Sequence, residues 1–443
     1  MKLLFILPEY PPHQGGGIVT FYRNLLPRLA ARGHEVRVLV GSGVFAAEDA
    51  SPVTVEGVRV ETLELARLQK ALPQFNRYAS LPGLQRHLAA AWALREQADR
   101  GEGFDVVEAT DWGLLFLPWA TEPGPPVVAQ MHGSCGQIDV HDPVAGEEAQ
   151  GELIRLLEAS AAGRVDALQS YSEANADFWR GQARAPVAMI PPAWRPLHEP
   201  GLIGKRSGRG LVVGRVQRWK GPEVLCEALR RLGDAAPPMD WMGRDTSFGT
   251  RAGSTAAHLA AAFPETWNRK VMHLPQQPPE AAARCQAEAA FVVVPSTWDM
   301  FNFTAIEAMG VGTPVICSTG AGAAYLIEDG ANGLLFDRED AASLAEALRR
   351  LGAMDETERK ALGEAGRETV RSRLDPERIA DLRLEAYERA AALPARAPAP
   401  DDWLRRACAP GPPLPDPLGF LEHLPLKPLA RHVARRALAK LRR

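Results

Sequence analysis

Short apolar runs alternate with amphipathic stretches and with glycine- or proline-containing turns along most of the chain. Residues 2–7, with a continuous apolar run after Lys2, predict a buried strand, residues 8–17 are a loop, and the apolar spacing over 18–32 predicts a helix. Residues 35–40 give the next strand. Continuous apolar strands that alternate with helices indicate a parallel sheet covered on both faces, the opening of a doubly wound α/β fold.

The second half of the chain opens in the same way, with a strand at 211–213, a loop at 214–221 and a helix at 224–232. We therefore expect two Rossmann-like domains. The expected parts are an N-terminal domain at 1–195, a C-terminal domain at 205–375 joined to it by a Pro-, Gly- and base-containing linker at 191–210, a closing helix at 376–393, and a tail at 394–443. Further strands are predicted at 106–108, 127–130, 187–190, 239–242, 271–274, 291–294 and 313–317.

The stretch 295–309 carries the most chemistry. Pro295 ends an apolar strand, the apolar pattern at 305–309 predicts a helix, and Asp299 lies on the turn between them, eight residues before Glu307. The N-terminus of a helix suits an anion such as a diphosphate, and carboxylates accept hydrogen bonds from hydroxyls. A nucleotide sugar contains both a diphosphate and many hydroxyls, so this stretch could bind one. A surface acid and a satisfied helix acid are the alternative from this window alone.

Three other loops offer ligand-binding groups at the predicted strand ends. Each also has a plainer interpretation: surface charge, a structural histidine or a flexible turn. His132 follows a strand at its carboxyl end, where open α/β sheets bind ligands. Arg215 and Lys220 bracket a glycine-containing turn, a reasonable clamp for a diphosphate. The third loop would let backbone amides approach a ligand, through Gly15, Gly16 and Gly17.

Composition narrows the class of protein. A chain of 443 residues with 46% hydrophobic residues is long enough for two cores, and a formal charge of −3 argues against a nucleic-acid footprint over the whole protein. Five cysteines without paired spacing fit a reducing compartment without structural zinc. The N-terminal apolar run is too short for a signal peptide, and no run of 18 apolar residues exists. We expect a cytoplasmic protein.

Two basic segments suggest an anionic partner. Residues 66–95 hold five Lys or Arg and no acid, so they could face an anionic acceptor or a lipid surface, or form a solvated helical excursion. Residues 394–417 are rich in Ala and Pro and predict a semi-rigid linker. Residues 427–443 predict a basic amphipathic helix, which would either contact an anionic membrane, at the inner face, or pack on the body.

With these motifs in order, roughly residues 1–390 resemble the GT-B glycosyltransferases, specifically the retaining family 4. The most specific part is the pair Asp299 and Glu307 with the segment Glu-Ala-Met-x-x-Gly-Thr-Pro-Val at 307–315. The glycine loop at 15–17 and the Arg–Lys loop at 214–221 agree in order and spacing. The resemblance implies two Rossmann-like domains facing across a cleft and a metal-independent transfer without a cofactor.

The resemblance also implies roles for individual residues. Arg215 and Lys220 would grip the donor diphosphate, Glu307 the ribose, and Asp299 the transferred sugar. His132 would reach the sugar from the N-terminal domain. Backbone groups around Phe301, Asn302 and Phe303, and the loop of Gly15, Gly16 and Gly17, would add contacts. The expected reaction moves a hexose from a UDP- or GDP-linked donor to a glycan, a lipid-linked glycan or a small molecule, with retention of configuration.

Four positions depart from the family pattern. Asp299 stands where the family usually has Glu, and Asn302 where it has Gly. Tyr325 aligns with a common Glu, and the Pro-Asn-Gly exit of the first domain is replaced at 191–193.

Two other functions remain open from the sequence: a nucleotide-sugar epimerase of the same fold, and a non-catalytic partner that binds a nucleotide or glycan.

Overall fold

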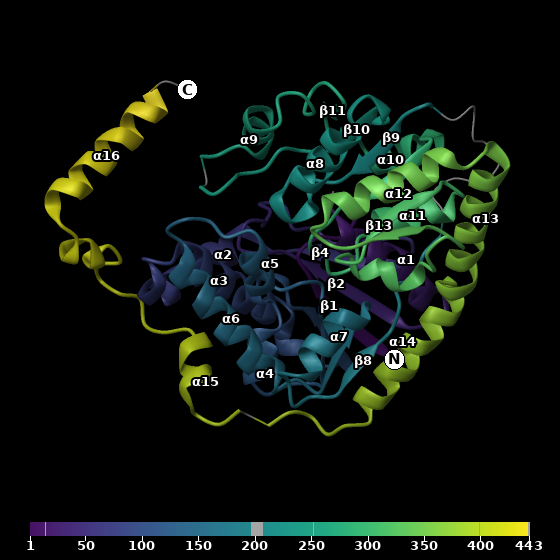
Figure 1. Ribbon diagram of the computed structural model, residues 1–443. Helices are drawn as coiled ribbons and strands as arrows, with labels where there is room; N and C mark the ends of the chain where they lie inside the picture. Colours follow the sequence, from purple (N-terminus) through teal and green to yellow (C-terminus); the bar gives the residue numbers. More distant parts are fainter. Residues whose placement is uncertain (14, 196–206, 251, 398, 442–443) are drawn as a thin grey trace.

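The computed structural model describes residues 1–13, 15–195, 207–250, 252–397 and 399–441. Two sheet domains, each flanked by helices, lie against each other (Figure 1). This confirms the α/β class and the pair of Rossmann-like domains. Most of the expected linker at 191–210 lies outside the described residues.

The first sheet has eight strands in the order β3-β4-β2-β1-β5-β6-β7-β8, and all neighbours are parallel except the β3–β4 hairpin. Its strands confirm those predicted at 2–7, 35–40, 106–108, 127–130 and 187–190, whereas β3, β4 and β7 were not predicted. The strands are β1 (Lys2–Leu7), β2 (Glu35–Val40), β3 (Val53–Val55), β4 (Val58–Thr62), β5 (Val106–Thr110), β6 (Val127–Gln130), β7 (Ala167–Ser170) and β8 (Val187–Met189).

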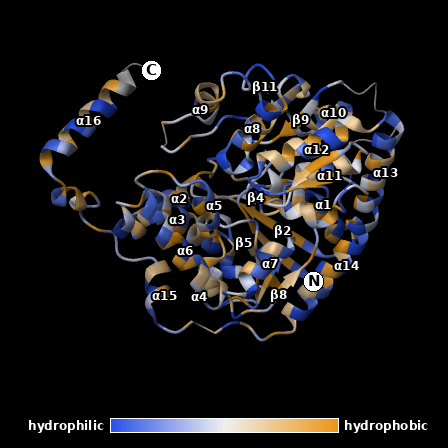
Figure 2. Cartoon of the chain, viewed as in Figure 1, coloured by the Kyte–Doolittle hydropathy of each residue, from blue (hydrophilic) through white to orange (hydrophobic). Residues whose placement is uncertain are grey.

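The second sheet has six parallel strands in the order β11-β10-β9-β12-β13-β14. Its central strands are buried along their whole length, which explains why they read as continuous apolar runs. Figure 2 shows these hydrophobic strands inside and the hydrophilic faces of the helices outside. The strands are β9 (Gly210–Val213), β10 (Met239–Met242), β11 (Val271–Leu274), β12 (Phe291–Val294), β13 (Val315–Ser318) and β14 (Leu334–Phe336).

The helices follow the amphipathic stretches of the sequence, and all but the last, which stands apart, lie against the two domains. They are α1 (Gly17–Ala31), α2 (Leu65–Ala71), α3 (Pro82–Gln97), α4 (Leu117–Thr121), α5 (Cys135–His141), α6 (Glu148–Ala162), α7 (Glu173–Arg180), α8 (Pro222–Leu232), α9 (Thr255–Ala262), α10 (Pro279–Glu288), α11 (Phe303–Gly310), α12 (Ala341–Ala353), α13 (Glu356–Arg373), α14 (Pro376–Ala391), α15 (Trp403–Cys408) and α16 (Leu426–Leu441). No helix in the described part of the chain has the length and apolar content needed to cross a membrane.

Each sheet has one point where the order of its strands reverses. In the first sheet the chain moves outward from β1 through β2 and β4, then returns to β5 on the other side of β1. In the second sheet the same reversal separates β9 from β12. Open α/β sheets bind ligands beyond the carboxyl ends of the strands at such points. The loops that follow β1, β9 and β12 carry most of the candidate residues.

The helix α14 belongs to the second half of the sequence but packs on the first domain. Its Arg383 is 1% exposed and donates to Glu108 in the middle of β5, at 3.0 Å, and to Gln130 at 2.6 Å. Tyr387, one turn later, donates to the other oxygen of Glu108 at 2.6 Å. These contacts give both terminal nitrogens of the guanidinium a hydrogen-bond partner, although Arg383 Nε has none among the described residues, and they fix α14 beneath the first sheet.

We expect Arg383→Met to lower the free energy of unfolding by about 3–5 kcal/mol, because it leaves the buried Glu108 carboxylate without its cation. Arg389→Met on the same helix is the matched control, since Arg389 is exposed and its ion pair is with the exposed Glu385. Its effect should stay within about 0.5 kcal/mol. Urea denaturation measures both, and equal effects of the two substitutions would contradict this account.

Candidate active site

The turn between β12 and α11 is shaped by Asn302. This residue has φ of +72°, a left-handed conformation that asparagine tolerates better than most residues, and its Oδ1 accepts from the backbone N–H of Thr304 as the N-cap of α11. Its Nδ2 donates to Asp299 Oδ2 at 3.0 Å and to Ser296 Oγ at 3.2 Å. Asn302 therefore starts the helix and aims the Asp299 carboxylate.

Lys220 and Asp299 form an ion pair at the point where the second sheet reverses. The lysine side chain is 18% exposed and the aspartate side chain 8%, and the ammonium also lies 4.2 Å from the centre of the Trp219 ring. Gly221, with φ of +74°, lets this loop approach β12, because a Cβ there would lie 1.8 Å from the carbonyl oxygen of Pro295. Lys220 and Asn302 line one small cavity together with Gly214 and Ser296.

Arg215 lies near the Lys220–Asp299 pair, among charged groups of both signs. Desolvation lowers the pKa of its guanidinium, as does the nearby Arg244, while Asp299 and Glu9 act in the opposite direction. The guanidinium is therefore surrounded by protein atoms, although part of the Arg215 residue remains open to solvent. The predicted clamp of Arg215 and Lys220 is thus assembled at one place, with Asp299 as an internal counter-charge.

The glycine loop of the first domain already holds a carboxylate. Glu9 Oε1 accepts from the backbone N–H of Gly16 at 2.8 Å, at the N-terminus of α1, which has no side-chain cap of its own. Burial raises the pKa of Glu9. Of the other glycines, Gly15 lies against Glu9, and a Cβ on Gly17 would lie 3.1 Å from the ring of Phe303. The loop therefore reaches helix α11 of the second domain, and an anion at α1 would have to displace Glu9.

His132 is buried and its two ring nitrogens face two tyrosines. Its Nδ1 lies 2.8 Å from Tyr171 Oη, and its Nε2 lies 3.3 Å from Tyr22 Oη. Because Tyr22 donates its hydrogen to Glu108, at 2.7 Å, the contact with Nε2 requires the imidazole to be the donor there. Burial, and the charge of Arg383, lower the pKa of His132, so the ring is neutral. Reaching a sugar hydroxyl would require one of these contacts to be exchanged.

Glu307 lies on α11 in a different cavity from Lys220. That cavity is also lined by Arg23 and Trp194, and Gln286 donates to Glu307 at 2.9 Å. Burial raises the pKa of Glu307, whereas Gln286 and Arg23 oppose the shift. The two acids of the motif thus point to separate parts of the region between the domains.

Aromatic contacts close the two domains over this region. Tyr171 of the first domain lies edge-on to Phe301, with ring centres 5.4 Å apart, and also contacts Phe303. At another point His141 stacks on Trp298 at 4.4 Å, and Gln217 donates to Asp142 at 2.7 Å. Trp298 directly precedes Asp299, so closure of the domains and placement of the acid are coupled.

Two acids that the sequence analysis did not single out lie behind His132. Asp111 Oδ1 accepts from the backbone N–H of His132 at 2.8 Å, and Glu158 accepts from that of Gly136 at 3.1 Å. Burial raises the pKa of Asp111 to about 7 and that of Glu158 to about 8. Asp111 could have been found, since it lies within three residues of the end of a predicted strand, as does Glu9. Glu158 and the two tyrosines carry no such signal.

Comparison with known proteins places the chain in a family. Residues 16–193 match the family model described as "Glycosyl transferase 4-like domain", and residues 208–353 match "Glycosyl transferases group 1". The D-inositol 3-phosphate glycosyltransferase of Arthrobacter sp. (strain FB24) is 29% identical over 367 residues, which cover 78% of this chain and 84% of the relative. The protein of the same name from Nocardia farcinica (strain IFM 10152) is 27% identical, over 76% of this chain and 77% of the relative.

Solved structures agree in fold. Sucrose-phosphate synthase from Thermosynechococcus elongatus superposes with a TM-score of 0.66 at 22% identity, over 88% of this chain and 99% of that one. Anabaena HepE in complex with UDP and glucose gives 0.64 at 16% identity, over 88% and 100%. The chain belongs to the group 1, family 4 glycosyltransferases of GT-B fold, and it is an enzyme of the glycosyltransferase class.

The raised pKa values of Asp111 and Glu158 predict a stability that falls as pH rises. Their ordinary values are 3.8 and 4.5, so between these and the raised values the folded state holds more protons than the unfolded one. The contribution of Asp111 should therefore fall from about pH 4 to about pH 7, and that of Glu158 from about pH 4.5 to about pH 8, by up to about 1.4 kcal/mol of unfolding free energy per pH unit for each carboxyl. Below about pH 6.5 the lowered pKa of His132 acts in the opposite direction, and comparison with a variant that keeps His132 cancels its effect.

Urea denaturation across this range provides the measurement. Asp111→Asn should remove its share of the slope, whereas Asp234→Asn, at an exposed loop position, should leave the slope unchanged. An unchanged slope in Asp111→Asn would show that this carboxyl is ionised in the folded protein.

Proposed function

We propose that the protein is a retaining, metal-independent glycosyltransferase that moves a hexose from a UDP- or GDP-linked donor. The cluster of Lys220, Asp299 and Asn302 carries this proposal, because it puts a cation and a hydroxyl-binding acid together at the reversal point of the second sheet. Arg215 adds a second cation beside it.

The chemistry asked of these side chains is electrostatic. The bond between the anomeric carbon and the diphosphate oxygen breaks, the acceptor oxygen bonds to that carbon on the same face, and the acceptor proton passes to the leaving phosphate. Lys220 and Arg215 offset the negative charge that grows on the diphosphate, a type of stabilisation often worth several kcal/mol. When the diphosphate binds, it competes with Asp299 for Lys220 and leaves the carboxylate free to accept from sugar hydroxyls. Asn302 keeps Asp299 aimed during this exchange.

Other parts of the donor have candidate partners in the same region. We assign the ribose to Glu307, whose oxygen is held by Gln286 in the cavity beside α1. Backbone groups of Phe301, Asn302 and Phe303, at the start of α11, are assigned to the sugar or phosphate. The loop of Gly15, Gly16 and Gly17 faces α11 and would receive a phosphate or the acceptor once Glu9 moves. His132 would contact the sugar after leaving Tyr22.

The relatives indicate which donors and acceptors to try first. HepE shares the fold, and its solved structures include one complex with UDP and one with UDP-glucose. UDP-glucose is therefore the first donor to test. The relatives are named D-inositol 3-phosphate glycosyltransferases, which supports a small-molecule acceptor as one alternative to a glycan or lipid-linked glycan. In the described residues no group of three or more His, Cys, Asp or Glu is placed to hold a metal ion.

Lys220→Ala and Arg215→Ala should each lower kcat by about 100- to 1,000-fold, because each removes a cation from the developing charge. Arg218→Ala is the matched control: Arg218 lies on the same loop, is exposed and makes no contact with Asp299 in the described structure. Its activity should stay near that of the unmodified protein. The assay follows nucleoside diphosphate release from labelled UDP-glucose and GDP-mannose with acceptor present.

Three results would contradict the proposal. Full activity in both alanine variants would remove the diphosphate assignment. Inversion of the donor sugar at C2 without transfer would instead identify a nucleotide-sugar epimerase. Binding of donor without any turnover, under conditions that support related enzymes, would favour the non-catalytic alternative.

A further inference from the structure

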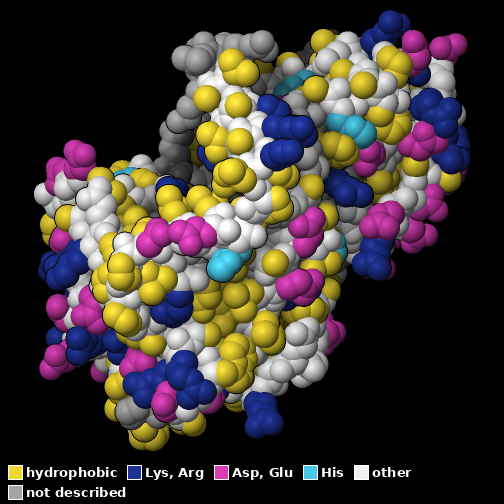
Figure 3. All heavy atoms as spheres, turned by 90° about the vertical axis from the view of Figure 1, so that its left-hand side faces the viewer, with side chains coloured by type: hydrophobic (Ala, Val, Ile, Leu, Met, Phe, Trp, Pro, Cys, Tyr) yellow, Lys and Arg dark blue, Asp and Glu magenta, His cyan; other side chains and the backbone are white. Residues whose placement is uncertain are grey.

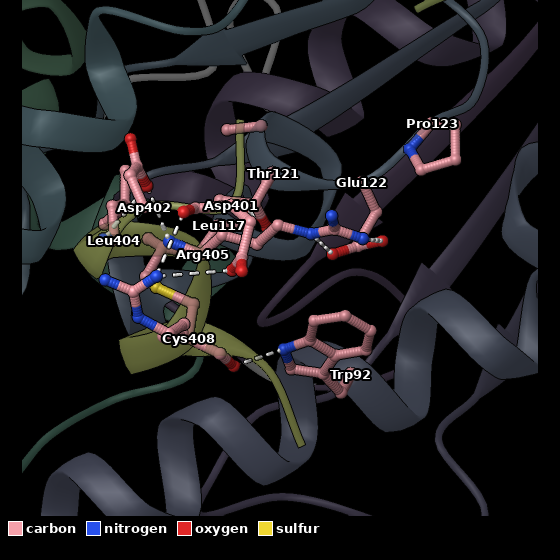
Figure 4. Close-up of polar contacts among 12 residues, drawn as sticks. Trp92, Leu117, Thr121, Glu122, Pro123, Asp401, Asp402, Leu404, Arg405 and Cys408 are labelled. Atoms are coloured by element: carbon pink, nitrogen blue, oxygen red, sulfur yellow. Dashed lines mark hydrogen bonds and ion pairs between the residues drawn. The ribbon is translucent and has the colours of Figure 1, made fainter. Parts of the chain in front are cut away.

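The chain beyond α14 returns to the first domain. We name residues 394–411, Pro398 excepted, the strap. Its helix α15 buries Leu404 and Cys408 completely in the hydrophobic core of the first domain, against α4 and α6. Figure 4 shows α15 seated beside Trp92, Leu117 and Thr121. A segment whose composition suggested a linker is therefore attached along its length.

Polar contacts fix the strap from both sides. Arg405 makes two hydrogen bonds with Glu122, at 2.9 and 3.0 Å, and Arg396 pairs with Asp166 at 2.8 Å (Figure 4 for Arg405). Asp402 caps α15 and pairs with Arg164. Bidentate and partly buried pairs of this kind hold a defined geometry, so the strap is docked on the first domain.

The strap also uses cations and donors of the basic stretch 66–95. Arg77 donates to the carbonyl oxygens of Ala407 and Ala409, at 2.7 and 2.6 Å, and Trp92 Nε1 donates to that of Cys408 at 2.7 Å. Arg95 is buried and donates to Pro123. Part of this stretch thus binds the chain itself, and it does not present a continuous cationic surface to an outside partner.

The helix α16 follows the strap and stands apart from both domains (Figure 1). Leu426 is 78% exposed and Val433 57%, and both lie on the same side of the helix as Leu429. Lys427, Arg431 and Arg435 lie on the opposite side and are exposed, and no acidic residue follows Glu422. Figure 3, which faces this side of the molecule, shows hydrophobic and Lys or Arg side chains side by side in its upper middle part.

These features favour a lipid surface over the other possible partners. Anionic headgroups complement a helix that has several cations and no acid, while the apolar stripe can enter the boundary of the acyl chains. Exposed apolar side chains on the approach to α16, Leu418 and Leu424, would add to the same contact. A helix that packed on the body would bury this stripe, and it is exposed instead.

We propose that α16 binds an anionic lipid bilayer in the plane of its surface, and that the strap fastens this anchor to the first domain. The anchor follows the donor domain in sequence, but the strap attaches it to the first domain. The donor domain would thus be left free to open and close while the first domain stays at the lipid surface. Resting on the proposed function, this arrangement suits a lipid-linked acceptor.

The test uses the full chain and sedimentation with vesicles of phosphatidylcholine containing about 30% phosphatidylglycerol, compared with phosphatidylcholine alone. The chain should bind the anionic vesicles only. Each positioned cation is worth about fivefold in affinity, so Lys427→Ala/Arg431→Ala/Arg435→Ala should weaken binding about a hundredfold. The matched control removes three exposed, ion-paired arginines of the body, Arg349→Ala/Arg371→Ala/Arg389→Ala, and should bind like the unmodified chain.

Equal loss in both triple variants would show a response to net charge and overturn the anchor. So would absence of binding to anionic vesicles, or an α16-dependent dimer in solution without such binding. Hydrogen exchange tests whether the strap stays docked on the first domain. On anionic vesicles α16 should gain protection, while α15 is protected with and without them. Loss of protection in α15 on binding would refute the role of the strap.

Release of nucleoside diphosphate from UDP-glucose in the absence of vesicles distinguishes a failure of the membrane anchor from a failure of the proposed glycosyltransferase activity. It should be equal in the two triple variants, since neither touches the donor site. If the unmodified chain turned over no donor yet bound anionic vesicles through α16, the proposed function would fail and the anchor would stand.

Discussion

The buried pair of Glu108 and Arg383 is the contact on which the architecture depends. It joins a strand at the centre of the first sheet to a helix 275 residues later, and each partner is 1% exposed. A buried ion pair needs further hydrogen bonds to offset its desolvation, and here Tyr22, Tyr387 and Gln130 supply them, while Arg383 Nε has no partner among the described residues. Because Tyr22 also contacts His132, the same carboxylate links the closing helix to the candidate site.

The candidate site keeps its cations and amides neutralised by the protein's own acids. Asp299 pairs with Lys220 at the second sheet, and Glu9 lies on the amide of Gly16 at the first. Both acids occupy positions that would suit a phosphate. A diphosphate ligand that displaced them would exchange internal charge pairs for contacts with the donor, and it would free Asp299 for the sugar. This exchange of internal acids for the diphosphate is what we propose for the site.

The sequence predicted most of the buried sheet and the loops of the site, because continuous apolar strands and the groups that directly follow them are local signals. It did not predict the β3–β4 hairpin, whose strand β3 is largely exposed and has no continuous apolar run. Nor could it show that Arg383 meets Glu108, since no local pattern marks a pair so distant in the chain. The strap was missed for a related reason: several of its attachments are backbone carbonyls, which composition does not reveal.

The central claim is that the Lys220–Asp299 pair opens to a nucleoside diphosphate. Thermal denaturation of the full chain with UDP, GDP and the nucleosides uridine and guanosine tests it most directly, because a ligand that binds the folded state raises the free energy of unfolding in proportion to ln(1 + [L]/Kd). One diphosphate should raise Tm, its nucleoside should not, and Lys220→Ala should abolish most of the shift. Equal shifts with nucleoside and diphosphate, or an undiminished shift in Lys220→Ala, would contradict the account.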